Sequence, residues 1–543
     1  MEIERVIEQM MNQEFVKYLT AEWNRPTGGN SEKNFSIEEE KLLSIIYGML
    51  KLQKFNFIDT FREEAFTAIK TNVKQTVIEA LSREDSIEVS RIDLSVFQQT
   101  KLLSFSTWII FLGRLFERLI TLLTRVSSVY GVISDGFEMV SSNVSLTKRP
   151  SQILDDIVED FYSKNDSKII LNDDYKELKE NLKEILCSVC DFANSRCAQI
   201  IELKVNNGAL DRLEPNEFMG FIEVIQNFTN ECEKLCGKKS PNLKLVIQLQ
   251  SNKFLKIFHD ERKTKIIQLL DLEQWKFVTN LSEQFQLLCT ELVKISKSNP
   301  EYNLIDIYSK YKSTKNQKSN INCNRIVLGE DSYVLVNAVI NLLYSILEYC
   351  EYSARIPYLS GDLLNRLIDL LKYFNARTSQ LVLGAMALQV SGLKTISAKI
   401  LVICARSLAF VARIIPAIKQ HFDDIFDKNN IRQNNLLKHF DEVIQLYENH
   451  YMNITDKILN MVRDVVHLNL VKWIAKPPVP SSCFQSISQH IKRLDENIHE
   501  FVPESELINL FENIHTIIIE AFREQVLELK IINDGGPQHG YVN

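Results

Sequence analysis

Cysteine is the residue type best placed for metal chemistry, because Cys187, Cys190 and Cys197 lie close together in CSVCDFANSRC. A structural zinc site needs four ligands, usually supplied as two paired motifs. The next two cysteines, Cys232 and Cys236, have the i, i+4 spacing of one helical face. The sequence therefore favours buried thiols that act as small hydrophobic side chains, and it predicts no metal site.

Phosphate and acyl-transfer chemistry have even weaker support. The run Gly237-Lys238-Lys239-Ser240 resembles the end of a phosphate-binding loop, but Cys232 stands where that motif needs its first Gly. The sequences G-x-S-x-G, G-x-G-x-x-G and H-E-x-x-H are absent, and the nine His are scattered. We therefore expect a protein that is not an enzyme, with no cofactor and no small-molecule substrate.

The charged run HDERK at 259–263 lies on a helical pattern. A solvated helix face is the simplest interpretation of such a run, and a partner-binding surface is the alternative. The whole chain carries a formal net charge of −7, from 63 basic and 70 acidic residues. This balance gives no reason to expect nucleic-acid binding.

Composition indicates a folded, helical chain. Hydrophobic residues make up 45% of the 543 residues, whereas Gly (16) and Pro (12) are scarce, which favours long helices with few tight turns. The ten Cys form no regular framework, as expected for reduced thiols in the cytosol. The two most apolar segments, 105–133 and 400–418, both contain arginines, so we expect no transmembrane segment and only peripheral membrane contact.

Helical periodicity predicts an all-α fold. A typical example is the i, i+3, i+4, i+7, i+8 pattern of Leu42, Ile45, Ile46, Met49 and Leu50. Polar breaks suggest four parts. These are an N-terminal helical bundle (1–150), a middle helical bundle (151–311), a polar linker (312–324, KSTKNQKSNINCN) and a C-terminal helical domain (325–543).

The stretch 373–399 is the most unusual, because small residues interrupt an otherwise apolar helical pattern that we expect to continue to residue 391. Gly inside a helix costs about 1 kcal/mol relative to Ala, so a packing reason is expected. Close helix–helix packing within the domain and a partner-binding groove are the two interpretations. The candidate interaction or packing surface consists of Tyr373, Asn375, Arg377, Gly384, Gly392 and Lys394.

Five segments carry a resemblance to a known family: FHDERKTKIIQLLDLEQWK (258–276), LLKYFNARTSQLVLGAMALQVSGLKTIS (370–397), LLKHFDEVIQLYENH (436–450), PPVPSSCF (477–484) and INDGGPQHG (532–540). In this order they resemble the family of vacuolar protein sorting-associated protein 54, the large subunit of the Golgi-associated retrograde protein (GARP) complex. The resemblance implies an elongated rod of successive helical bundles, as in the multisubunit tethering complexes of the CATCHR type. The family's N-terminal coiled-coil region and its last C-terminal helices are expected to be absent from this chain.

The resemblance also implies a function. A GARP subunit takes part in vesicle tethering for retrograde transport from endosomes to the trans-Golgi network, on the cytosolic face of those membranes. The implied partners are the other three GARP subunits, SNAREs that bind through the missing N-terminal region, and the endosomal or Golgi membrane, contacted peripherally. Two alternatives stay open: a syndetin-like subunit of the endosome-associated recycling complex, and a generic helical scaffold. Among the five segments, FHDERKTK and INDGGPQHG favour the GARP subunit.

Overall fold

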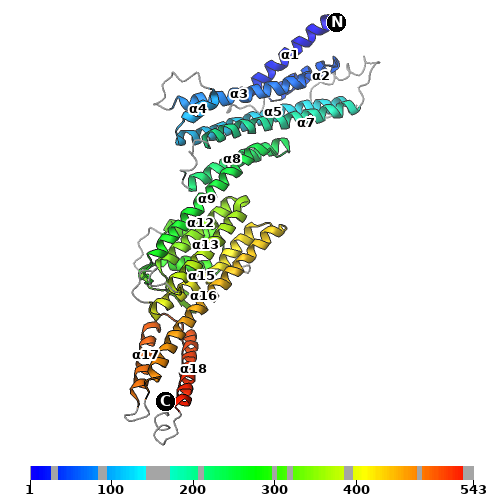
Figure 1. The fold of residues 1–543 in the computed structure, drawn as a ribbon. Helices are drawn as coiled ribbons and strands as arrows, with labels where there is room; N and C mark the ends of the chain where they lie inside the picture. The colour runs from blue at the N-terminus through cyan, green and yellow to red at the C-terminus, as the bar shows by residue number, and fades with distance from the viewer. Residues whose placement is uncertain are drawn as a thin grey trace. The chain divides into compact units, whose positions relative to one another are not determined.

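The computed structural model describes residues 2–25, 35–83, 95–141, 172–205, 213, 215–295, 302–314, 322–384, 396–473 and 480–529. Within these ranges the chain forms sixteen α-helices and only four short strands, so the predicted all-α class is confirmed (Figure 1). Contacts divide the chain into two compact units, Met1–Phe254 (unit 1) and Leu255–Asn543 (unit 2). The finer divisions expected at residue 150 and at 312–324 stay predictions.

Unit 1 is built from long helices. They are α1 (Glu2–Trp23), α2 (Phe35–Lys51), α3 (Phe57–Leu81), α4 (Val96–Leu102), α5 (Phe105–Ser141), α7 (Asn172–Val205), α8 (Pro215–Cys236) and the first part of α9 (Pro241–Asp271). The apolar stripe of α5 packs against α3, α7 and α8, and the stacked rings of Phe116 and Phe228 lie 4.6 Å apart. Buried Lys204 on α7 donates to the carbonyl oxygen of Leu103, which caps the end of α4.

The cysteines singled out in the sequence lie on α7 and α8 of unit 1. All ten cysteines of the chain are free thiols, and Cys187, Cys190, Cys197, Cys232 and Cys236 are buried. Burial raises the pKa of Cys232 to about 12, and it also raises the pKa of Cys190 and Cys197. Cys190, Cys197 and Cys232 therefore stay protonated at neutral pH, and the five buried cysteines fill core space, as the sequence favoured.

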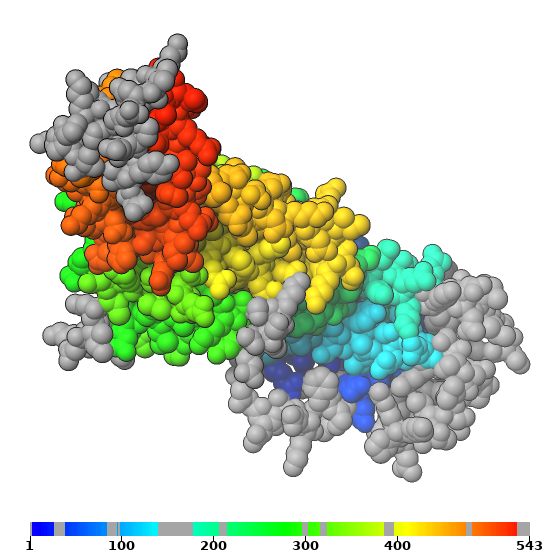
Figure 2. All heavy atoms as spheres, turned by 90° about the horizontal axis from the view of Figure 1, so that it is seen from below, coloured from blue at the N-terminus to red at the C-terminus, as the bar shows by residue number. Residues whose placement is uncertain are grey.

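Unit 2 contains the rest of α9, then α10 (Glu283–Val293), α11 (Leu304–Thr314), α12 (Asn337–Arg355), a 3-10 turn η3 (Pro357–Leu359) and α13 (Ser360–Val382). It continues with α15 (Ala398–Ile425), α16 (Ile431–Leu470), α17 (Ser482–Ile498) and α18 (Glu504–Leu529). In the space-filling view α18, in red, lies along the orange part of the chain that holds α17 and the end of α16 (Figure 2). These three helices bury Val466, Leu470, Ile487 and Ala521 between them.

α15 is the central helix of unit 2 and packs against both α12 and α16. It is the one helix, among the residues that the structure describes, that is long and apolar enough to cross a membrane by length and composition. Of its most apolar window, 72% is buried inside the protein, which is the environment of a core helix.

α13 ends earlier than the sequence predicted. Its last residue is Val382, whereas the apolar pattern suggested a helix to residue 391. Gly384 therefore lies just beyond the helix, and the prediction of a glycine in a helix interior is wrong. A Cβ at this position would lie 2.5 Å from the carbonyl oxygen of Gln380, so the tight turn after α13 explains the glycine.

The strands form two small antiparallel pairs: β1 (Leu281–Ser282) with β2 (Asn322–Cys323), and β3 (Ile326–Leu328) with β4 (Asp331–Tyr333). β3 and β4 are joined at Gly329, whose φ of +69° suits a tight turn. The Gln286 side chain covers the outer edge of β3. Its Nε2 donates to the Val327 carbonyl oxygen (2.7 Å), and its Oε1 accepts from the Val327 N–H (2.9 Å). Gln286 thus makes the two bonds that a neighbouring strand would make.

Replacing Gln286 by Ala is expected to speed hydrogen exchange at the Val327 amide roughly fivefold, since the mutation removes a hydrogen bond worth about 1 kcal/mol from an exposed strand edge. Hydrogen-exchange NMR or mass spectrometry would measure the change. Leu287→Ala is the matched control, because Leu287 is the next residue on α10 and points to solvent. Equal exchange rates in the Gln286→Ala variant and the unmodified chain would contradict this role for the side chain.

Candidate functional site

α13 lies between α9 and α16 in unit 2, so that three of the five family-like segments meet around one helix. On one side, the Nζ atom of Lys263 on α9 is 2.7 Å from Asp369 on α13. On the other side, the Tyr447 hydroxyl of α16 donates to the carbonyl oxygen of Leu371 (3.0 Å). Segments that are far apart in the sequence therefore form one continuous packed region.

A buried histidine connects α9 to two other helices. His259 is 6% exposed, with Nδ1 2.8 Å from the Tyr349 hydroxyl and Nε2 3.1 Å from a carboxylate oxygen of Asp369. Because the carboxylate only accepts, Nε2 carries the proton and Nδ1 accepts from Tyr349. Burial lowers the pKa of His259, while the hydrogen bond to Asp369 opposes that shift. The neutral ring therefore connects α9, α12 and α13.

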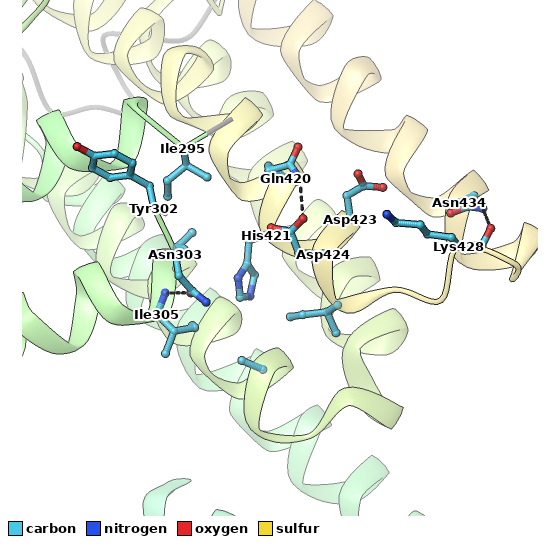
Figure 3. Close-up of a pocket in the computed structure, with 13 residues that line it drawn as sticks. Ile295, Tyr302, Asn303, Ile305, Gln420, His421, Asp423, Asp424, Lys428 and Asn434 are labelled. Atoms are coloured by element: carbon cyan, nitrogen blue, oxygen red, sulfur yellow. Dashed lines mark hydrogen bonds between the residues drawn. The ribbon is translucent and has the colours of Figure 1, made fainter. Parts of the chain in front are cut away.

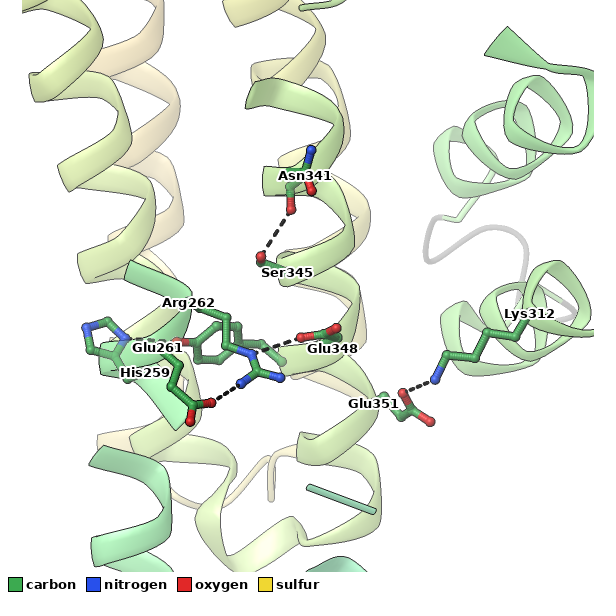
Figure 4. A network of polar contacts seen from close by, with 9 residues as sticks. His259, Glu261, Arg262, Lys312, Asn341, Ser345, Glu348 and Glu351 are labelled. Atoms are coloured by element: carbon green, nitrogen blue, oxygen red, sulfur yellow. Dashed lines mark hydrogen bonds and ion pairs between the residues drawn. The ribbon is translucent and has the colours of Figure 1, made fainter. Parts of the chain in front are cut away.

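Arg262 makes the next contact along α9 (Figure 4). Its side chain is 15% exposed, its Nε donates to Glu348 (2.9 Å), and its guanidinium lies 3.8 Å from the ring centre of Phe258.

The charged run at 259–263 is thus only partly a solvated face. Asp260 and Glu261 are exposed, whereas His259, Arg262 and Lys263 hold α9 on α12 and α13.

The α16 side of α13 contains a second buried polar pair. Asn375 donates to the Leu446 carbonyl oxygen (3.2 Å), and its Oδ1 lies 2.8 Å from Nδ1 of His450, which is 3% exposed. Burial lowers the pKa of His450 to about 4, so the ring is neutral at physiological pH. Asn375 is therefore a packing residue between two helices.

The other residues of the candidate surface are placed differently. Half-buried Tyr373 lies under Lys263, whose Nζ atom is 4.9 Å from the ring centre. Arg377 pairs with Asp271 at the end of α9 (2.7 Å). Gly384 is exposed after the helix, and Gly392 and Lys394 lie outside the described residues. The structure thus brings Tyr373, Asn375 and Arg377 together on α13, with contacts to its own neighbouring helices.

A buried arginine on α15 was missed as a site by sequence reasoning. The Arg406 side chain is 3% exposed, pairs with Glu506 of α18 (2.9 Å) and donates to the Ser332 carbonyl oxygen (2.7 Å). Its guanidinium lies 4.7 Å from the ring centre of Tyr333, and the Tyr451 hydroxyl donates to the same Glu506 carboxylate. An arginine in the middle of an apolar helix was the available signal, but the sequence did not reveal its partner.

The described part of the chain holds no group of three or more His, Cys, Asp or Glu side chains that could bind a metal ion. The polar clusters above consist of neutral histidines, paired carboxylates and arginines, most of them bonded to another helix. Such an arrangement holds helices together. It supplies no activated nucleophile of the kind that covalent catalysis needs.

Comparison with known proteins identifies the family. A family model described as Vps54-like protein matches residues 330–464. Vacuolar protein sorting-associated protein 54 of Mus musculus is 30% identical over 619 residues, which cover 100% of this chain and 62% of the relative. The Drosophila melanogaster protein of the same name is 31% identical, with 100% of this chain and 54% of the relative covered.

A plant protein named vacuolar protein sorting-associated protein 54, chloroplastic, from Arabidopsis thaliana, is 24% identical over 65% of this chain and 39% of its own length. The chain thus spans 54% to 62% of the length of the fly and mouse relatives. The matched range 330–464 begins just before α12, contains α12, α13 and α15, and ends within α16, so it includes most of the packed region around α13. With similarity to the two animal proteins along its whole length, the chain belongs to the family of Vps54-like proteins.

Proposed function

We propose that this chain is a non-enzymatic subunit of the GARP vesicle-tethering complex and acts in retrograde transport from endosomes to the trans-Golgi network. The carrying observation is the similarity to vacuolar protein sorting-associated protein 54 along the whole chain. A fold made of long helices that pack side by side suits a protein that works by binding other proteins. The proposed location is the cytosolic face of the trans-Golgi network and endosomes, with peripheral membrane contact.

The proposed partners are the other three GARP subunits, with SNAREs engaged by the N-terminal region of the full-length relatives. The half-buried edge of α13 with Tyr373 and Arg377, together with Gly384, is the proposed contact surface. The side chains of Tyr373 and Arg377 reach solvent while they also contact α9, so a partner could bind them without unfolding the unit.

Affinity purification of the tagged chain, with mass spectrometry of the co-purifying proteins, tests this proposal. Enrichment of the other three GARP subunits is expected. The double variant Tyr373→Ala, Arg377→Ala should reduce that enrichment if α13 is the contact surface. Lys419→Ala is the control, because Lys419 makes an exposed ion pair on α15 and α16 and lies outside the proposed surface.

Two outcomes would contradict the proposal. Recovery of subunits of the endosome-associated recycling complex, together with a recycling-endosome location, would assign a syndetin-like role instead. A folded chain that recovers no tethering subunit would favour a generic scaffold. Fluorescence microscopy against trans-Golgi and recycling-endosome markers separates the first outcome from the expected one.

A further inference from the structure

A pocket of about 810 Å³ opens in unit 2, away from the α13 surface (Figure 3). Five described parts of the chain form it: Ile295 after α10, the start of α11 with the two residues before it, the end of α12, the last turns of α15, and the start of α16 with the turn before it. Its volume lies in the range of small-ligand sites, which is roughly 300–1,000 Å³. The polar lining residues are Tyr302, Asn303, Gln420, His421, Asp423, Asp424, Lys428 and Asn434.

The side chains that line the pocket carry a net negative charge and so attract a positively charged ligand. Asp423 and Asp424 contribute two carboxylates, and Lys428 contributes one ammonium group, so the formal balance is −1. The pocket also lies at the C-terminal ends of α12, through Ala354, and of α15, through Ile425. Helix C-termini carry partial negative charge because their last carbonyl groups have no partner within the helix.

His421 provides an independent reason to expect a ligand. The side chain lines the pocket although the residue is 6% exposed, and its Nε2 lies 2.9 Å from the Cys350 carbonyl oxygen. A carbonyl oxygen only accepts, so Nε2 carries the proton and Nδ1 has a lone pair. Both bonds that the described residues make with this ring involve Nε2, the other being with the Ser353 hydroxyl (2.9 Å). Nδ1 is therefore left as a hydrogen-bond acceptor at the pocket wall.

Further acceptors lie around the same space. Asn303 Oδ1 accepts one bond, from the Ile305 N–H (2.9 Å), and keeps a second lone pair. Asp424 accepts from Gln420 Nε2 (2.7 Å) and can accept more bonds. A bare metal ion does not fit, since no cluster of metal-binding side chains occurs among the described residues. An organic cation fits, because it carries both the positive charge and several N–H donors.

We propose that this pocket binds an organic cation, a guanidinium or ammonium group, between the carboxylates of Asp423 and Asp424 and the acceptors of His421 and Asn303. The group could come from a basic side chain of a partner protein or from a free polyamine. This proposed cation site does not depend on the proposed tethering role. Small molecules that carry only the cationic group can test it without any tethering partner.

Ligand-observed NMR titration of the full chain with N-acetyl-arginine amide tests the proposal, with N-acetyl-citrulline amide as the uncharged probe of nearly the same shape. The arginine probe is expected to bind roughly tenfold more tightly, as two partly exposed carboxylates would produce. The double variant Asp423→Asn, Asp424→Asn should remove that preference while it keeps the amide oxygen that can accept from Gln420. Asp427→Asn is the control, since this carboxylate follows α15 without lining the pocket.

Spermidine provides the second arm of the experiment. Tighter binding of the arginine probe than of spermidine would assign the pocket to a protein side chain, and the reverse order would assign it to a free polyamine. Equal binding of the arginine and citrulline probes would overturn the proposal. So would an absence of binding by every cation, or a preference for the arginine probe that survives in the Asp423→Asn, Asp424→Asn variant. Circular dichroism of each variant checks that it is folded.

Discussion

Replacing Glu506 by Gln is expected to lower the free energy of unfolding of unit 2 by about 3 kcal/mol, since the change leaves a buried charge without its counter-ion. Here that charge is Arg406, with a side chain only 3% exposed. Urea unfolding measures the effect, and hydrogen exchange of peptides from α18 locates it. The largest increase in exchange is expected in α18, because Glu506 connects this helix to α15.

Removing the other partner of the ion pair, Arg406, should lower the free energy of unfolding by less. In Arg406→Met the remaining carboxylate of Glu506 is 38% exposed and can be hydrated, so we expect a loss of about 1 kcal/mol. The pair Lys419–Asp441 gives a matched control on α15 and α16, with side chains 35% and 60% exposed. Asp441→Asn should cost less than about 0.5 kcal/mol. A cost of Glu506→Gln no larger than that of Asp441→Asn would disprove the stabilising role of the Arg406–Glu506 pair.

Lowering the pH from 7 to 5 is expected to destabilise unit 2 by about 2 kcal/mol for each of two buried histidines, His421 and His450. Burial lowers the pKa of both to about 4. In the unfolded chain a histidine has a pKa of about 6.5, so the unfolded state takes up the proton first as the pH falls. The stability contribution is therefore complete above pH 6.5 and is lost progressively down to pH 4.

Urea unfolding at pH 7, 6 and 5 checks this dependence. His421→Gln and His450→Gln, which remove the titrating ring and keep a polar side chain, should each flatten the profile. His490→Gln on α17 is the control, because that side chain is exposed. If neither buried-histidine variant changes the slope of stability against pH, then the cause of the acid destabilisation lies elsewhere, for example in carboxylates.

The elements of the fold were predictable from the sequence, because periodicity depends on neighbours three and four residues apart. The apolar segment 400–418 lies within α15, and most of its residues are buried. The predicted end of α13 was wrong. The apolar residues after Val382 continue the helical pattern in the sequence, but the backbone turns before Gly384. A local pattern does not contain the tertiary contacts that end a helix.

The polar contacts were predictable only in part. The sequence marked the run at 259–263 and the residues around Tyr373, but it did not show that Lys263 would lie over that ring. Arg406 and Glu506 are a hundred residues apart in the sequence, so nothing local indicates that they pair. The cation pocket is assembled from five separate described segments, and a single sequence without aligned relatives carries no signal for such an arrangement.

Arg406 of α15 also has a consequence for the chain during its synthesis. When this helix leaves the ribosome, the residues that will bind it have not all been made, and its mean hydropathy of 2.0 over the most apolar window resembles that of a membrane anchor. An arginine near the centre of a helix raises the cost of insertion by the translocon by about 2.5–3.5 kcal/mol. Arg406 therefore disfavours misdirected insertion of the nascent chain before Glu506 has been translated, and the same guanidinium later joins α15 to α18.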